Sequence, residues 1–253
     1  MRFLTLILAC CAQSAFAQQQ NWAVINDPDG FTNVRLQPSA TSPAPYQVNQ
    51  YQVFSCTKQP GDWWVFEIPE GTRMPLPDGK GYIHKSRVRL FSEMPDSALQ
   101  STICRLLAHH LETIVASNRL FDKYLANGKK FSAEDEATYK KLGQLREDGY
   151  EYSYYPLMTY MPGYLQRTRD SVVLLAWCKV LAEDTGSASE SPGYAMGELF
   201  RQAPEWVIRI IRPLPKRERS IVIGQIEFGL MEVKLPEAKR KAFEKRLNEL
   251  ENL

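Results

Sequence analysis

From residue 22 the chain reads Trp22-Ala23-Val24-Ile25-Asn26-Asp27-Pro28-Asp29-Gly30-Phe31-Thr32-Asn33-Val34-Arg35-Leu36. Short β-branched and apolar runs flank a cluster of turn formers at 27–30, which is typical of two strands joined by a tight turn. The same alternation continues to residue 90. It predicts strands at residues 22–25, 33–36, 50–56, 63–68, 81–84 and 88–90, with further turns at 59–62 and 77–79. Several short strands at this spacing predict a small β-barrel or sandwich.

Three landmarks in this region resemble the bacterial Src homology 3 (SH3) type domain. They are Asn33-Val34-Arg35 at a strand start, Gly61-Asp62-Trp63-Trp64 in a hairpin, and Gly81-Tyr82-Ile83-His84 in a closing strand. The resemblance implies an SH3-like β-barrel over residues 18–92. The sequence departs from the family where Leu36-Gln37 replaces the usual Ser-Gly pair and where residues 69–78 lengthen a loop. Because such barrels use these loops for ligands, the resemblance does not carry a particular ligand over to this chain.

The apolar period changes from strand-like to helical after residue 96. Leucine, isoleucine and valine recur three and four residues apart from Leu99 to Val115, which predicts an amphipathic helix over 97–126 capped by Asp96 or Ser97. Ser132 opens a polar helix to residue 148 in a pattern that resembles a capping box. Further helices are expected at 169–183, 194–201, 204–212, 217–231 and from 236 onward. The expected fold class is therefore multidomain, a small SH3-like β-barrel followed by an all-α helical domain over residues 97–253.

The amino terminus has the three parts of a secretory signal. Met1-Arg2 supplies a positive start, residues 3–12 form a short apolar run, and Ala15-Phe16-Ala17 is a small-residue cleavage site. We expect a signal peptide over residues 1–17, cleavage between Ala17 and Gln18, and a periplasmic or secreted protein. Cys10 lies in a loose lipoprotein box, but only nine residues precede it, so lipid anchoring there is not expected.

The composition is that of a globular protein, with 44% apolar and 24% charged residues. Lys and Arg together number 31 and Asp and Glu 29, which leaves a net charge of +2. Since so small an excess cannot neutralise many phosphates, no nucleic-acid partner is expected. No apolar run reaches the roughly 18 residues of a membrane-spanning helix, so no transmembrane segment is expected in the mature chain.

Three cysteines remain after the predicted cleavage, namely Cys56, Cys104 and Cys178. An odd number cannot form a complete disulfide framework, and a chain of this size does not need one. Cys104 and Cys178 lie on predicted helices and could pair. Buried free thiols are the favoured alternative for all three.

Catalytic and metal-binding motifs are not found. The chain has no Gly-x-Ser-x-Gly elbow, no Walker loop, no Gly-x-Gly-x-x-Gly and no His-Glu-x-x-His. His109 and Glu112 could share a helix face, but a metal needs further ligands, and the adjacent His110 points about 100° away on a helix. No metal or cofactor is therefore expected, and His84 is interpreted as structural. Glu198 would be the candidate acid of a sugar hydrolase, although a surface glutamate is the favoured interpretation.

Two aromatic clusters are the strongest candidates for ligand contact. The barrel cluster is Tyr46, Tyr51, Trp63, Trp64 and Tyr82, and strand alternation sends the two tryptophans to opposite faces. The tyrosine cluster is Tyr150, Tyr152, Tyr154, Tyr155, Tyr160 and Tyr164. Pro156 and Pro162 predict that this second segment is not a long regular helix. Its tyrosines either bind a peptide or sugar or pack the joint between the two halves of the chain.

The favoured hypothesis is an exported, non-enzymatic binding protein. Its SH3-like module would recognise cell-wall peptide or an envelope protein, and its helical domain has no role that the sequence indicates. One alternative is a peptidoglycan hydrolase with an active site in the helical domain. Another is an assembly subunit whose helices pack on a second chain, and the sequence does not decide the oligomeric state.

Overall fold

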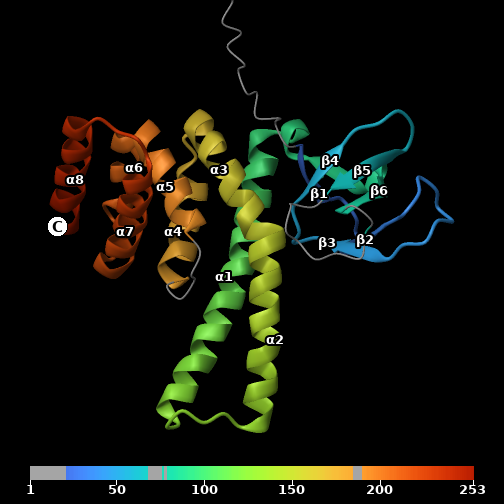
Figure 1. Cartoon of the computed structure of the whole chain (residues 1–253), viewed down its shortest axis with the longest axis horizontal. Coiled ribbons are helices and arrows are strands. Elements are labelled where there is room, and N and C mark those ends of the chain that lie inside the picture. The colour runs from blue at the N-terminus through green and yellow to red at the C-terminus, as the bar shows by residue number, and fades with distance from the viewer. Residues whose placement is uncertain (1–20, 68–75, 77–78, 185–189) are drawn as a thin grey trace, which may run out of the picture.

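The computed structural model describes residues 21–67, 76, 79–184 and 190–253. The predicted signal peptide, with its cleavage site at Ala17 and Gln18 and with Cys10, lies outside these residues, as does most of the insertion at 69–78. The chain folds as an antiparallel β-sheet region followed by a helical region (Figure 1).

The sheet region contains one five-stranded antiparallel sheet in the order β6-β5-β4-β1-β7 and a separate two-stranded ribbon, β2-β3. The strands are β1 (Trp22–Ile25), β2 (Phe31–Val34), β3 (Tyr46–Asn49), β4 (Phe54–Thr57), β5 (Trp63–Glu67), β6 (Lys80–His84) and β7 (Val88–Leu90). A single bridge between Arg35 and Tyr82 joins the ribbon to β6. No closed barrel forms among the described strands. The expected antiparallel sheet is therefore confirmed, whereas the expected closure of that sheet into a barrel is not.

The strands differ from the expectation in three places, of which one is that the strand expected at 50–56 is confined to β4 at Phe54–Thr57. The second strand begins at Phe31 rather than at Asn33, because residues 31–34 pair along their whole length with β3. β3 itself was not expected. Its sequence, Tyr46-Gln47-Val48-Asn49, buries only Val48 and so has little apolar signal.

The helical region contains eight α-helices and one π-helical turn within the described residues. They are α1 (Asp96–Ala126), α2 (Ala133–Gly149), the π turn η4 (Tyr150–Tyr154), α3 (Tyr155–Thr168), α4 (Ser171–Glu183), α5 (Ser191–Gln202), α6 (Pro204–Ile211), α7 (Lys216–Glu232) and α8 (Glu237–Glu251). The Ser132 hydroxyl accepts a hydrogen bond from the Asp135 backbone N–H, which confirms the expected cap of α2.

The expectation that residues 150–164 do not form a long regular helix is confirmed, but their helical character was not predicted. The segment is helical throughout, because Pro156 lies in the first turn of α3, where its missing N–H costs nothing. It is nevertheless not regular, since the π turn separates α2 from α3 and Pro162 lies inside α3.

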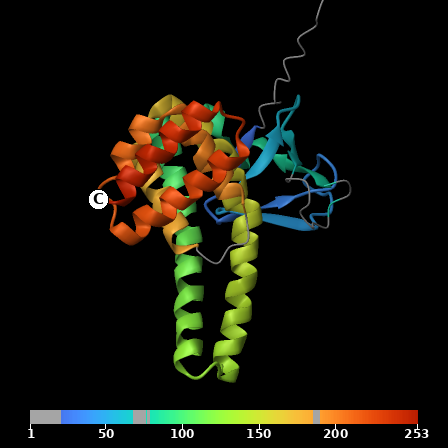
Figure 2. The ribbon, with the colours of Figure 1, turned by 60° about the vertical axis from the view of Figure 1, so that its left-hand side comes forward.

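One hydrophobic core connects the two regions. Trp22, Val24 and Val53 of the sheet region and Phe91 after β7 belong to the same buried cluster as the α1, α3 and α4 core residues. A smaller cluster around Phe54, Phe66 and Ile83 lies within the sheet region. The sheet therefore packs against the helices as part of one core. Figures 1 and 2 both show the sheet region on one side of α1 and helices α4–α8 on the other.

Helices α5 and α7 pack backbone against backbone through glycines. A Cβ atom built at Gly229 would lie 2.0 Å from the Gly193 carbonyl oxygen, and one built at Gly197 would lie 2.6 Å from the Gly229 carbonyl carbon. Gly193 and Gly197 are four residues apart and so share one face of α5. This contact, which the sequence interpretation missed, allows no side chain at these three positions.

Cys56, Cys104 and Cys178 are free thiols, so the bridge between Cys104 and Cys178 does not form. Cys56 and Cys178 are buried and Cys104 is half-buried. Burial raises the pKa of the Cys56 and Cys178 thiols to about 12, which keeps them protonated and unreactive. Across the described ranges, no helix has both the length and the apolar character to cross a bilayer.

Candidate functional site

The three sequence landmarks meet at one polar cleft at an edge of the sheet region. The cleft has a volume of about 250 Å³ and is lined by Asp27, Asp29, Phe31, Thr32, Asn33, Arg35, Trp63, His84 and Arg87. Asn33 and Arg35 come from the first landmark, Trp63 from the second and His84 from the third. Segments some 50 residues apart in the chain thus contribute to a single surface.

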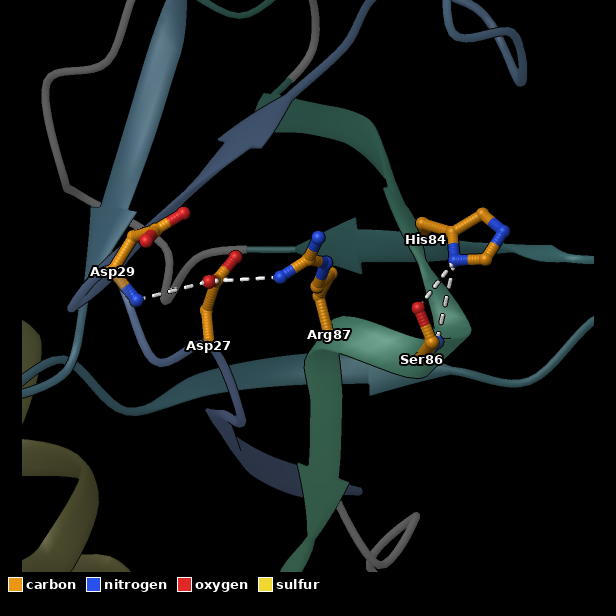
Figure 3. Close-up of polar contacts among 5 residues, drawn as sticks. All are labelled: Asp27, Asp29, His84, Ser86 and Arg87. Atoms are coloured by element: carbon orange, nitrogen blue, oxygen red, sulfur yellow. Dashed lines mark hydrogen bonds and ion pairs between the residues drawn. The ribbon is translucent and has the colours of Figure 1, made fainter.

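Asp27 organises the turn that forms one wall of this cleft (Figure 3). Its side chain is only 6% exposed, and its Oδ1 atom accepts hydrogen bonds from the Asp29 backbone N–H at 3.2 Å and from the Arg87 guanidinium at 2.9 Å. The turn closes with a Gly30 N–H to Asp27 carbonyl bond at 3.1 Å, and Gly30 has a φ of 77° that favours glycine. Asp27 is therefore a structural carboxylate that fixes the turn to Arg87.

Asp29 differs from Asp27 in that it is exposed and its carboxylate has no bond to Arg87 (Figure 3). Within the part of the chain that the structure describes, this carboxylate accepts no hydrogen bond and forms no ion pair. An exposed carboxylate on a turn fixed by Asp27 is available to an ammonium or amide group of a ligand.

His84 is held in one orientation at the opposite wall. Its Nδ1 atom accepts from the Ser86 backbone N–H at 3.4 Å and lies 2.8 Å from the Ser86 hydroxyl oxygen (Figure 3). Because Nδ1 accepts, the neutral ring carries its proton on Nε2. Nε2 has no hydrogen-bond partner among the described residues. The Trp63 and His84 rings are in T-shaped contact, with centroids 5.3 Å apart and planes at 86°.

The charges around the cleft are balanced. Asp27 and Asp29 oppose Arg35 and Arg87, while the Arg35 guanidinium donates to the Ser42 carbonyl at 2.6 Å. Arg87 pairs with Asp27, whereas the Ser42 carbonyl that Arg35 contacts is neutral, so Asp29 and Arg35 are the two charges of the cleft without a charged partner among the described residues. The cleft therefore presents the Asp29 carboxylate as an acceptor, the Arg35 guanidinium and the His84 imidazole as donors, and the rings of Trp63 and the exposed Phe31.

The other members of the barrel cluster lie elsewhere. Trp64 packs against the core of the sheet region with the Lys58 ammonium 5.4 Å from its ring centroid, so the two tryptophans do face opposite ways. Tyr46 packs on Phe66 and accepts from Gln52. Tyr51 stacks on His109 of α1 at 3.6 Å, and the Tyr82 backbone pairs with Arg35 beside the cleft. Of the five residues, only Trp63 lines the cleft.

The tyrosine cluster lies largely at the joint between the two regions. Tyr154 and Tyr164 are buried, and the Tyr152 carbonyl accepts from the Val53 backbone N–H at 2.6 Å. Tyr160 packs edge-on against Phe91 at 5.1 Å. Tyr150 and Tyr152 are half-buried and Tyr155 is exposed. This placement fits the alternative in which the rings pack the joint, and the six tyrosines do not line a common cavity among those described.

The tyrosine cluster includes an unusual buried pair. The Trp177 indole N–H donates to the Tyr154 hydroxyl at 3.0 Å, and the His110 imidazole stacks on the Tyr154 ring at 4.6 Å. His110 is 3% exposed, and neither of its ring nitrogens has a hydrogen-bond partner. Burial, followed by the nearby Arg146 and His109, lowers the His110 pKa to about 4. The sequence analysis did not identify this desolvated group.

The remaining candidates do not form a reaction centre. In the described ranges no group of three or more His, Cys, Asp or Glu side chains could hold a metal ion. Glu198 is half-exposed and bound to Arg201 and Gln202, and the Arg201 interaction lowers its pKa, whereas a general acid needs a raised one. A larger hollow of about 720 Å³ along α8 is lined by that helix and Asn252 alone, so no second element encloses it.

Asp27, Asp29, Arg35 and Arg87 were not identified as site residues from the sequence, and His84, which lines the cleft, was interpreted there as structural. Asp27 and Asp29 were interpreted only as turn formers, although two acids in a turn next to a motif segment could have indicated a polar site. No family model, curated protein or solved structure matches the chain.

Proposed function

We propose that the protein is an exported binding protein whose sheet region is a bacterial SH3 type module. In this proposal the cleft between Asp29, Trp63 and His84 holds a short peptide of the cell wall. The observation that carries the proposal is that all three landmarks of the resemblance contribute to this one cleft. A module that used these segments for the fold alone would not need to bring a free acceptor, a free donor and an aromatic face together.

The chemistry of the cleft suits a peptide better than a sugar or a purely anionic ligand. Asp29 can accept from an ammonium or amide N–H, and His84 Nε2–H can donate to a carbonyl or carboxylate. Trp63 supplies apolar contact area between them. Cell-wall peptides carry both amines and carboxylates, so they match a cleft that holds a carboxylate acceptor beside guanidinium and imidazole donors.

The test is a pull-down with purified peptidoglycan, in parallel with an envelope extract. We expect wild-type protein to be enriched on peptidoglycan and Trp63→Ala to lose that enrichment. Trp64→Ala is the matched control, since it removes an indole of the same strand that lies outside the cleft. Far-UV circular dichroism establishes that both variants are folded.

The outcomes separate the possible partners. Enrichment of wild type and Trp63→Ala to the same extent contradicts the proposed cleft. A Trp63-dependent partner in the envelope extract, with no retention on peptidoglycan, shows a protein ligand instead. Muropeptide profiles that change during incubation would favour the alternative of a peptidoglycan hydrolase, whereas the proposal expects them to stay unchanged.

A further inference from the structure

Residues 119–145 form a two-helix arm that extends away from the rest of the molecule. It consists of the carboxyl end of α1, the connection at 127–132 and most of α2, and Figures 1 and 2 both show it projecting beyond the other helices. Its base is fixed where Asn118 donates to the Glu183 carbonyl and Arg146 pairs with Asp184. Along the arm the two helices contact each other, as in the Lys123–Asp135 ion pair and the ring contact between Phe121 and Tyr139.

The arm buries no residue completely. Every residue from 119 to 145 is exposed or half-buried, and α2 contains no buried side chain. Phe121 and Leu125, one turn apart on α1, are 44% and 47% exposed, and Leu145 on α2 is 45% exposed. Phe121 belongs to an aromatic group at the tip with Tyr124, Phe131 and Tyr139. Two helices alone leave half of each apolar side chain in water, whereas four helices enclose a core.

The charges along the arm are arranged in a self-complementary way. Lys129 and Lys130 lie at the tip, and no carboxylate of the described chain forms an ion pair with either. Glu147, Asp148 and Glu151 lie at the base, where Asp148 accepts only from the Gln144 side chain and Glu147 and Glu151 pair with no cation in the described ranges. An arm placed antiparallel on a second arm therefore brings two tip lysines against these base carboxylates, at both ends at once. Parallel arms would place four lysines together.

We propose that the arm binds the arm of a second copy of this chain, antiparallel, to form a four-helix bundle around a two-fold axis. Such an axis makes each contact twice, since the lysines of one copy meet the carboxylates of the other and the reverse. The exposed apolar side chains of the two α1 ends are then covered by the bundle. This inference is independent of the proposed cleft, which lies on the sheet region.

The test is the mass of the purified protein in solution, measured by light scattering after size-exclusion chromatography at several salt concentrations. We expect twice the chain mass for wild type. The double variant Lys129→Glu/Lys130→Glu is expected to be monomeric, because it places like charges at both contacts. Adding Glu147→Lys and Asp148→Lys to the same chain is expected to restore the dimer. Lys129, Lys130 and Glu147 are exposed and Asp148 is half-buried, and circular dichroism verifies the helicity of each variant.

A monomeric wild type, a double variant that stays dimeric, or a charge-swapped variant that stays monomeric would each overturn the proposal. Flotation with phosphatidylglycerol vesicles tests whether the arm binds a lipid surface instead of a second arm. Monomeric protein that floats with these vesicles, and fails to do so as Phe121→Ser, would show that the tip binds a lipid surface rather than a second arm.

Discussion

Acidification is expected to destabilise the protein through His110. The imidazole is buried between α1, α2 and the π turn, stacked on Tyr154, with Arg146 and His109 as its charged or titratable neighbours. Arg146 also pairs with Asp184, which holds its positive charge close to the ring. Protonating His110 would therefore create an unpaired cation in an apolar site next to another cation.

The sign and size of the effect follow from the two pKa values. The ring has a pKa of about 4 when folded, against an ordinary value of 6.5 when unfolded. The unfolded chain therefore binds the proton first as the pH falls. Stability is fully present above pH 6.5 and is lost as the pH falls toward 4, at about 1.4 kcal/mol per pH unit. Between pH 7 and pH 5 this amounts to a loss of about 2 kcal/mol in the free energy of unfolding.

Urea unfolding followed by tryptophan fluorescence at pH 7 and pH 5 measures this loss. His110→Phe keeps a ring on Tyr154 and removes the titration, so the variant is expected to lose about 2 kcal/mol less than wild type over the same interval. At pH 7 it is expected to be at least as stable, because the two unpartnered nitrogens disappear. His109→Gln is the control. His109 is only half-buried, so protonating it in the folded protein costs less free energy than protonating His110. Equal losses in wild type and His110→Phe would refute the reasoning.

Two further predictions concern the helical packing and the amino terminus. Gly229→Ala is expected to destabilise the protein by about 3 kcal/mol or more, because its methyl group would meet the Gly193 carbonyl. Gly224→Ala, on the exposed side of the same helix, is expected to be neutral or to stabilise the protein by up to ~1 kcal/mol. Thermal unfolding compares the two, and similar melting temperatures would contradict the close approach of α5 and α7. Mass spectrometry of the protein purified from its own cells is expected to find Gln18 as the first residue, and a chain that retains Met1 or carries a lipid on Cys10 would show the signal prediction to be wrong.

The periodic parts of the fold could be predicted from the sequence, and the irregular parts could not. The long α1 was predicted within one residue at its start because Leu99, Ile103 and Leu106 repeat on one face. β3 was missed because an edge ribbon with one buried residue carries almost no apolar pattern. Residues 150–168 were not predicted to be helical because the prolines were interpreted as helix breakers wherever they occur. In the first turn of a helix, as in α3, a proline is tolerated.

The candidate site shows a similar division. The landmarks around Arg35, Trp63 and His84 could be identified from the sequence, because each combines a turn with an aromatic or polar residue at a fixed position. Their convergence depends on pairing between distant strands, such as Trp63 with His84, which no local pattern encodes. The different roles of Asp27 and Asp29 depend on Arg87, which lies 60 residues after Asp27 in the sequence.

The most direct test of the proposed function is isothermal titration calorimetry with a soluble cell-wall stem peptide. The proposal predicts saturable binding with one site per chain. It also predicts at least a tenfold weaker affinity for Trp63→Ala and for Asp29→Asn, corresponding to a loss of about 1.4 kcal/mol or more, and an unchanged affinity for Trp64→Ala. Absence of binding by wild type, or the same affinity in wild type and Trp63→Ala, would contradict it.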